Sequence, residues 1–134
     1  MPKKTEYQDK WERSPGYVYF IAAGEPVKAV KIGVTVQRGI KRRLRGLQSA
    51  NHEPLKILGV IPFEGVKRPM LAAEKKEREL HQKFAHLQRF EKGWVGSEWF
   101  SVTPKLLEEI KRISVRPMSL GIVASLAKPG PGSA

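Results

Sequence analysis

Residues 16–36 read GYVYFIAAGEPVKAVKIGVTV and predict the beginning of a sheet. The first part, residues 17–23, is rich in aromatic and β-branched side chains, which favour strands. The second part, residues 27–36, alternates apolar side chains with others, as a half-buried strand does. A Gly-Glu-Pro sequence at residues 24–26 separates the two and is typical of a turn. We therefore expect an antiparallel hairpin.

Outside the hairpin, apolar periodicity predicts three helices and two more strands. The helices span residues 38–50, 70–87 and 103–113, and the strands span residues 55–63 and 98–101. The resulting order is strand, strand, helix, strand, helix, strand, helix. It indicates an α+β fold, a small, largely antiparallel sheet of three to four strands flanked by about three helices.

The two ends of the chain differ in composition from this central part. Residues 1–15 are polar, end in Ser-Pro-Gly and are expected to form a flexible arm before the domain at residues 16–115. The tail, residues 116–134, has an apolar stretch at 120–127 that suits a short strand or helix. Its last residues, 128–134, are Pro, Gly and Ser rich and are expected to be disordered.

Composition narrows the classes of function. The 134 residues include no cysteine, which excludes disulfides, iron–sulfur clusters and cysteine-rich zinc sites. The formal net charge of +12 favours a polyanionic partner, with nucleic acid ahead of an anionic membrane surface. The sequence has no signal peptide and no run of about 20 apolar residues. We expect an intracellular, cytoplasmic protein, associated with the nucleoid or encoded by a phage, with no membrane partner.

Glu77 breaks the pattern of the helix predicted at residues 70–87. It follows Ala73 by four residues and precedes Leu80 by three, inside the stripe that otherwise faces the core. A buried, unpaired carboxylate costs several kcal/mol, so Glu77 requires a basic partner, a metal ion or a position where the stripe meets solvent. Glu79 lies about 200° away around the helix and should face water.

Arg43 presents the same anomaly with the opposite charge in the helix at residues 38–50. It follows Ile40 by three residues and precedes Leu47 by four, at the edge of the apolar stripe, whereas Arg42 points away. A basic block surrounds it and forms a cationic face suited to phosphates. Its members are Arg38, Lys41, Arg42, Arg43 and Arg45.

Tyr19 and Lys31 lie on the two strands of the hairpin, and each precedes an apolar residue, so their side chains are expected on one face. A packing aromatic and a solvent-facing lysine are the simpler interpretations. His81 follows Glu77 by one turn and is interpreted either as part of the same site or as a core-edge histidine holding a backbone carbonyl. His52 is a candidate substrate contact, and Trp94 a candidate lid or base-stacking residue.

Several short segments resemble the GIY-YIG nuclease superfamily, over residues 16–110. Tyr17-Val18-Tyr19 matches the first family motif, and Lys31-Ile32-Gly33 matches the second, with lysine in place of tyrosine. That replacement is similar to a phage and bacterial branch with four segments in a fixed order. They read VKIGVT at residues 30–35, RLRGLQ at 43–48, ERELH at 77–81 and EWF at 98–100.

The resemblance implies a metal-dependent endonuclease acting on DNA. It places a phosphate-binding arginine at Arg43 and a carboxylate ligand for one divalent cation at Glu77. A single carboxylate suits Mg²⁺, which keeps several waters, and Mn²⁺ should substitute. Tyr19 would position or deprotonate the attacking water, but a free tyrosine is only about 0.1 % ionised at neutral pH. Lys31 would assist it or bind water or phosphate, so the base remains open among Tyr19, Lys31 and His81.

Two other functions compete with the nuclease. A non-catalytic nucleic-acid-binding module would keep the fold and the basic face, and the lysine at position 31 favours it. A small basic structural protein of the ribosome or nucleoid would explain the charge but not the position of Glu77. DNA or RNA, duplex or branched substrate, and a monomer with weak specificity or a homodimer all remain open from the sequence.

Overall fold

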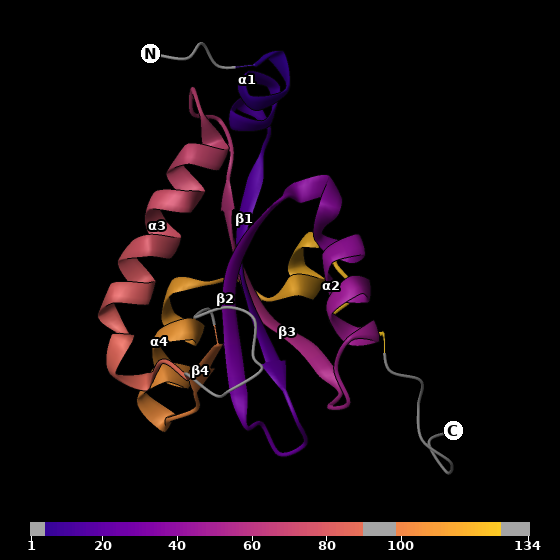
Figure 1. Ribbon diagram of the computed structural model, residues 1–134, viewed down its shortest axis with the longest axis vertical. Helices are drawn as coiled ribbons and strands as arrows, with labels where there is room; N and C mark the ends of the chain where they lie inside the picture. The colour runs from indigo at the N-terminus through magenta and orange to yellow at the C-terminus, as the bar shows by residue number, and fades with distance from the viewer. Residues whose placement is uncertain (1–4, 90–98, 127–134) are drawn as a thin grey trace.

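The computed structural model describes residues 5–89 and 99–126, which contain four α-helices and four β-strands (Figure 1). The predicted α+β class is confirmed. The elements in chain order are α1 (Glu6–Arg13), β1 (Gly16–Ala23), β2 (Ala29–Val36), α2 (Ile40–Ser49), β3 (Leu55–Phe63), α3 (Pro69–Lys83), β4 (Trp99–Ser101) and α4 (Pro104–Ile113). Short 3₁₀ turns occupy Gln37–Gly39, Ala85–Leu87 and Pro117–Leu120.

The strands form one sheet in the order β3-β1-β2-β4, and every neighbouring pair is antiparallel. Helix α2 covers one face of the sheet, and α3 and α4 cover the other (Figure 1). Two apolar clusters fill the two interfaces. One joins Tyr19, Ile21 and Trp99 to Leu44 of α2, and the other joins Val18, Phe20, Ile32 and Phe100 to Leu80 of α3 and Leu106 of α4.

Within the segment predicted as a flexible arm, residues 6–13 form helix α1. Thr5 begins α1 with a capping box: its hydroxyl accepts from the Gln8 backbone, and the Gln8 side chain accepts from the Thr5 backbone. Arg68 then ties α1 to the start of α3, with its Nη1 3.1 Å from Asp9 and 2.7 Å from Glu12. The helix is thus held by partners distant in sequence.

The rest of the predicted order agrees with the structure, with small shifts at the ends. The helix predicted at 38–50 starts as the 3₁₀ turn Gln37–Gly39, and the helix predicted at 70–87 ends at Lys83. The apolar stretch at 120–126 forms neither a strand nor an α-helix, although Ile57 donates to the Ala124 carbonyl at 2.8 Å. Within the described ranges, no helix has the length and apolar character needed to cross a membrane.

Candidate active site

The polar residues of the hairpin share the sheet face covered by α2. Tyr19 pairs with Gly33, and Ile21 pairs with Lys31. Because directly opposed residues project to the same face, Lys31 lies with Tyr19 and Ile21, both members of the α2-side cluster. The expected placement of Tyr19 and Lys31 on one face is therefore confirmed.

The Tyr19 ring crosses the strand next to it. A methyl group added at Gly33 would collide with the Tyr19 hydroxyl and its Cζ, so only glycine leaves room for this ring position. The glycine of the second motif therefore leaves room for the Tyr19 hydroxyl to lie over β2. Tyr19 itself is buried, with 2 % of its surface exposed.

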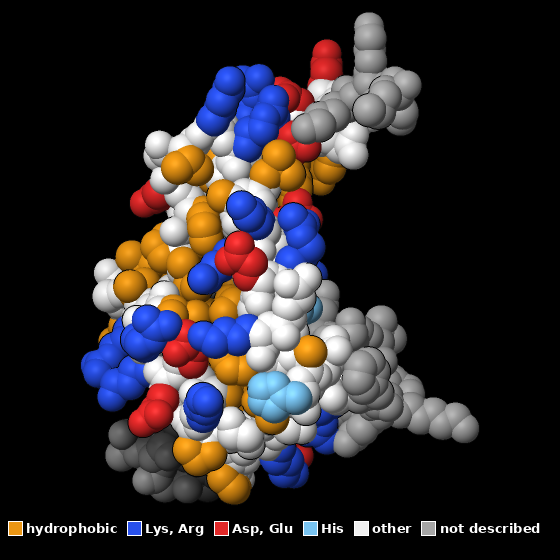
Figure 2. Space-filling model, turned by 90° about the vertical axis from the view of Figure 1, so that its left-hand side faces the viewer, with side chains coloured by type: hydrophobic (Ala, Val, Ile, Leu, Met, Phe, Trp, Pro, Cys, Tyr) orange, Lys and Arg blue, Asp and Glu red, His pale blue; other side chains and the backbone are white. Residues whose placement is uncertain are grey.

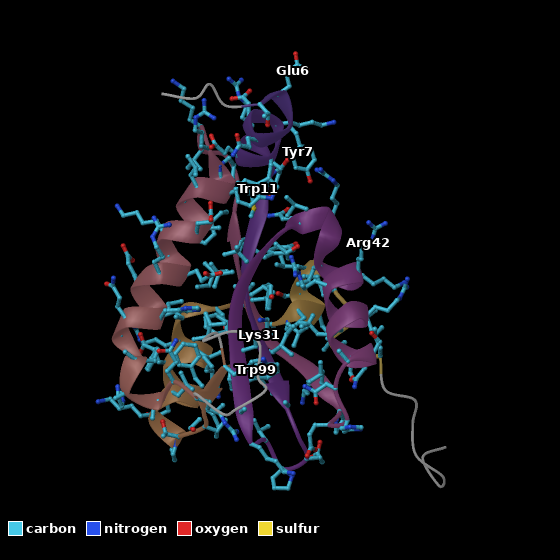
Figure 3. The ribbon with its side chains drawn as sticks, viewed as in Figure 1. Glu6, Tyr7, Trp11, Lys31, Arg42 and Trp99 are labelled. Carbon is cyan, nitrogen blue, oxygen red and sulfur yellow. The ribbon has the colours of Figure 1, made fainter. Side chains whose placement is uncertain are left out.

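Lys31 is buried as well, with 6 % of its surface exposed, which contradicts its interpretation as a solvent-facing lysine. Its Nζ lies 5.9 Å from the centroid of the Trp99 ring, and the two side chains lie close together in Figure 3. An aromatic face stabilises a desolvated cation at this distance. Lys31 therefore supplies a positive charge inside the α2-side interface.

The edge of β2 is open along part of its length. Strand β4 pairs only with Ala29, Val30 and Lys31, so in the described residues no strand covers β2 from Ile32 to Val36 on that side. Helix α3 runs beside this open edge. His81 marks the contact, because its Nε2 lies 2.9 Å from the Ile32 carbonyl and must carry the proton that it donates.

Glu77 lies one helical turn before His81, and α3 runs in the direction opposite to β2 (Figure 1). One turn is about 5.4 Å, or nearly two strand residues, which brings Glu77 to the level of Gly33 and Val34 on the open edge. Glu77 is half-buried, whereas Glu79 is exposed, in agreement with the sequence periodicity. The carboxylate thus sits where the core stripe meets solvent.

The arginines of α2 lie on the other side of the sheet from α3 (Figure 1). Arg38, Arg42 and Arg43 line a cavity of about 770 Å³ between α1 and α2, and all are exposed. Lys41 and Arg45 are exposed but do not line this cavity, nor does His52 in the loop after α2. Trp94 and Glu98 lie outside the described residues.

The structure therefore groups the predicted residues into two sets. Tyr19, Lys31 and Arg43 belong to the α2 side, and Glu77 and His81 belong to α3. The sheet separates the two sets, which come to the same level along β2 at Gly33, where the Tyr19 ring lies over the strand. In the described part of the chain, no three His, Cys, Asp or Glu residues converge as metal ligands.

Burial and the nearby charge of Glu64 raise the pKa of the neighbouring phenol, Tyr17. Tyr17 therefore stays protonated at neutral pH.

Residues 16–115 match the family model of the T5orf172 domain. The chain belongs to the T5orf172 domain family. The match contains the complete sheet together with α2, α3 and α4, and it leaves α1 outside. No curated protein and no solved structure matches the chain in the corresponding searches.

Sequence analysis missed two residues beside the T5orf172 domain. Tyr7 and Trp11 of α1 line the same cavity as the arginines, but their segment was interpreted as an arm. Two signals indicate them: the Thr5-x-x-Gln8 capping box and the four-residue spacing of the aromatics, which puts both on one helical face.

Proposed function

We propose that this T5orf172 domain is a metal-dependent endonuclease of the GIY-YIG type, which hydrolyses phosphodiester bonds in DNA. The observation that carries the proposal is the open edge of β2. There the Tyr19 ring crosses Gly33 from one face, and α3 brings Glu77 to the same level from the other. Lys31, which is buried on the same face as Tyr19, and the arginine-lined cavity both lie on the α2 side of the sheet, where the substrate would bind.

Each residue has a role that follows from its position. Arg43 binds the scissile phosphate and offsets the charge that grows on its oxygens during attack. Tyr19 holds the attacking water through its hydroxyl, and the Lys31 ammonium favours the partial negative charge that the phenol acquires. His81 orients this edge by donating from Nε2 to Ile32, which leaves only its Nδ1 to accept a proton.

The donor set fits a weakly held divalent cation. Glu77 offers one carboxylate at a solvent boundary, which suits Mg²⁺ because this ion keeps several waters and takes further oxygens from phosphate. When bound, the ion supplies a Lewis acid for the phosphoryl oxygen. Mn²⁺, with similar oxygen preference, substitutes for Mg²⁺.

A non-catalytic DNA-binding module is the second candidate. It is favoured by the position of α3, which approaches the sheet from the face opposite to Arg43. In such a module the exposed arginines bind phosphates, and Glu77 plays only a structural part. The two candidates differ in what happens when Glu77 loses its charge.

The test is nicking of supercoiled plasmid at low salt during a titration with Mg²⁺ or Mn²⁺. Glu77→Gln should lower the rate about 10²–10³-fold, the usual cost of removing one group that stabilises a transition-state charge. Arg43→Ala should lower it to a similar extent. DNA binding measured in EDTA should persist in Glu77→Gln.

Glu79→Gln is the matched control, since it removes the same charge from the exposed side of the same helix. It should cleave within about twofold of the wild type, the scale of a screened surface charge. If the wild type binds plasmid but does not nick it with either metal, the binding module replaces the nuclease.

A further inference from the structure

The α1–α2 cleft, defined as the cavity of about 770 Å³ described above, combines aromatic and cationic walls. Its α1 wall carries Tyr7 and Trp11, and its α2 side carries Arg38, Arg42 and Arg43. Figure 3 shows Tyr7 and Trp11 on the side of α1 toward the start of α2. Among the described residues, no acidic side chain lines the cleft, and its charged lining residues are all arginines.

Ion pairs hold two of the three acidic residues of helix α1, Asp9 and Glu12, away from the cleft. Asp9 pairs with Arg13 and Arg68, and the buried Glu12 pairs with Arg68. These ion pairs lie on the helical face roughly opposite to Tyr7 and Trp11. The aromatic residues are thereby held toward the cleft, yet Tyr7 keeps 79 % of its surface exposed. The Tyr7 ring, which lines the same cleft as the arginines, is therefore not part of the core.

Gly46 in the middle of α2 is a second, independent observation at the cleft. Glycine is among the poorest helix formers, and a methyl group added here would meet no other atom of the protein within 4 Å. Internal packing therefore does not require glycine at this position. Because Gly46 has no side chain, the cleft stays open beside Arg42 and Arg43.

We propose that the α1–α2 cleft binds an unpaired nucleotide of a single-stranded nucleic-acid segment, with its base stacked on Tyr7 and Trp11 and its phosphates on the three arginines. Aromatic stacking beside cations is how single strands are bound without sequence preference. The volume lies within the range of about 300–1,000 Å³ typical of small-ligand pockets, which is enough to admit a base. The proposal rests on the proposed nuclease function and names its substrate as nucleic acid with unpaired bases.

The test is fluorescence anisotropy with labelled oligonucleotides in EDTA, so that binding is measured without cleavage. The probes are single strands of dT and of rU of about 12 nucleotides, and a duplex of the same length. The wild type should bind a single strand more tightly than the duplex. Tyr7→Ala should weaken single-strand binding about tenfold, the effect of losing one stacked base, and leave duplex binding within about twofold.

Two further variants exclude a simple folding defect. Tyr7→Phe keeps the stacking surface and should bind as the wild type does. Gly46→Gln places a longer side chain, and a better helix former, in the cleft, so it should weaken single-strand binding without lowering the melting temperature.

Equal wild-type affinity for single strand and duplex, or an equal loss of both in Tyr7→Ala, would overturn the proposal. The dT and rU probes distinguish DNA from RNA as the source of the strand. Because nicking of plasmid is measured separately in the same preparations, a failed cleft and a failed nuclease give different results.

Discussion

The two faces of the sheet differ in the polarity of the side chains that they bury. The face under α3 and α4 is lined by apolar residues such as Val18, Phe20 and Phe100, and its polar residues lie at the edge. The face under α2 carries an ammonium and two phenols in its interior, and its covering helix has basic residues and no acidic one. Along α3, by contrast, acidic and basic side chains are mixed (Figure 2).

The two faces therefore differ in the role of their side chains. We call the face under α3 and α4 the structural face and the face under α2 the chemical face. Strand alternation gives each face every second residue, so one hairpin contributes to an apolar core on both sides and places its buried polar groups on the α2 side only. Glu77 is the exception. It lies on α3, which covers the structural face, but we propose that it acts at the open edge of β2 together with residues of the chemical face. The following predictions test this division.

The largest effect on stability is expected on the structural face. Phe20→Ala should lower the free energy of unfolding by about 3–5 kcal/mol, because it empties a fully buried position. Its neighbour on the chemical face should behave differently: Tyr19→Phe should cost at most about 1.5 kcal/mol, the net worth of one hydrogen bond, and yet remove most cleavage. Urea unfolding followed by circular dichroism measures both. Equal stability losses in the two variants would contradict the division.

A smaller loss is expected where the two faces meet. Gly33→Ala should lower the free energy of unfolding by about 1–3 kcal/mol, because the new methyl group displaces the Tyr19 ring. It should also reduce nicking, because the displaced hydroxyl leaves the open edge. Gly46→Ala, which adds the same methyl group in open space, is the control and should be neutral or stabilising. A Gly33→Ala protein with wild-type stability and activity would show that the position of the Tyr19 ring does not depend on the absence of a side chain at residue 33.

These positions also show what the sequence could and could not predict. Strand β3 begins and ends where it was predicted, and Thr103 caps α4 through the Leu106 backbone, because both depend on local pattern. Helix α1 was missed although its Thr5–Gln8 capping box is a local signal, and its anchor, Arg68, lies 59 residues after Asp9, beyond the reach of local pattern. Periodicity distinguished Glu77 from Glu79, but no local signal indicates that Glu77 and Arg43 approach the sheet from opposite faces.

The smallest effect on stability is expected at the ion pairs of Glu109, on the outer surface of α3 and α4. Arg112 and Lys83 lower the pKa of Glu109 from its ordinary value of 4.5 to about 2, and so link α4 to α3. Because the folded-state pKa is the lower one, this stabilisation is complete above about pH 4.5 and is lost as the pH falls toward 2. Glu109→Gln should therefore flatten the decline in melting temperature over this window. An unchanged slope would mean that the charges are screened.

The central claim is that Tyr19 and Glu77 act together at the open edge of β2, and a double-mutant cycle on the cleavage rate tests it most directly. Tyr19→Phe and Glu77→Gln should each lower kcat/KM about 10²–10³-fold, and the double variant should be no slower than the slower single variant within about threefold. Effects that multiply instead, to about 10⁴–10⁶-fold, would show two independent residues on the two faces and contradict the account.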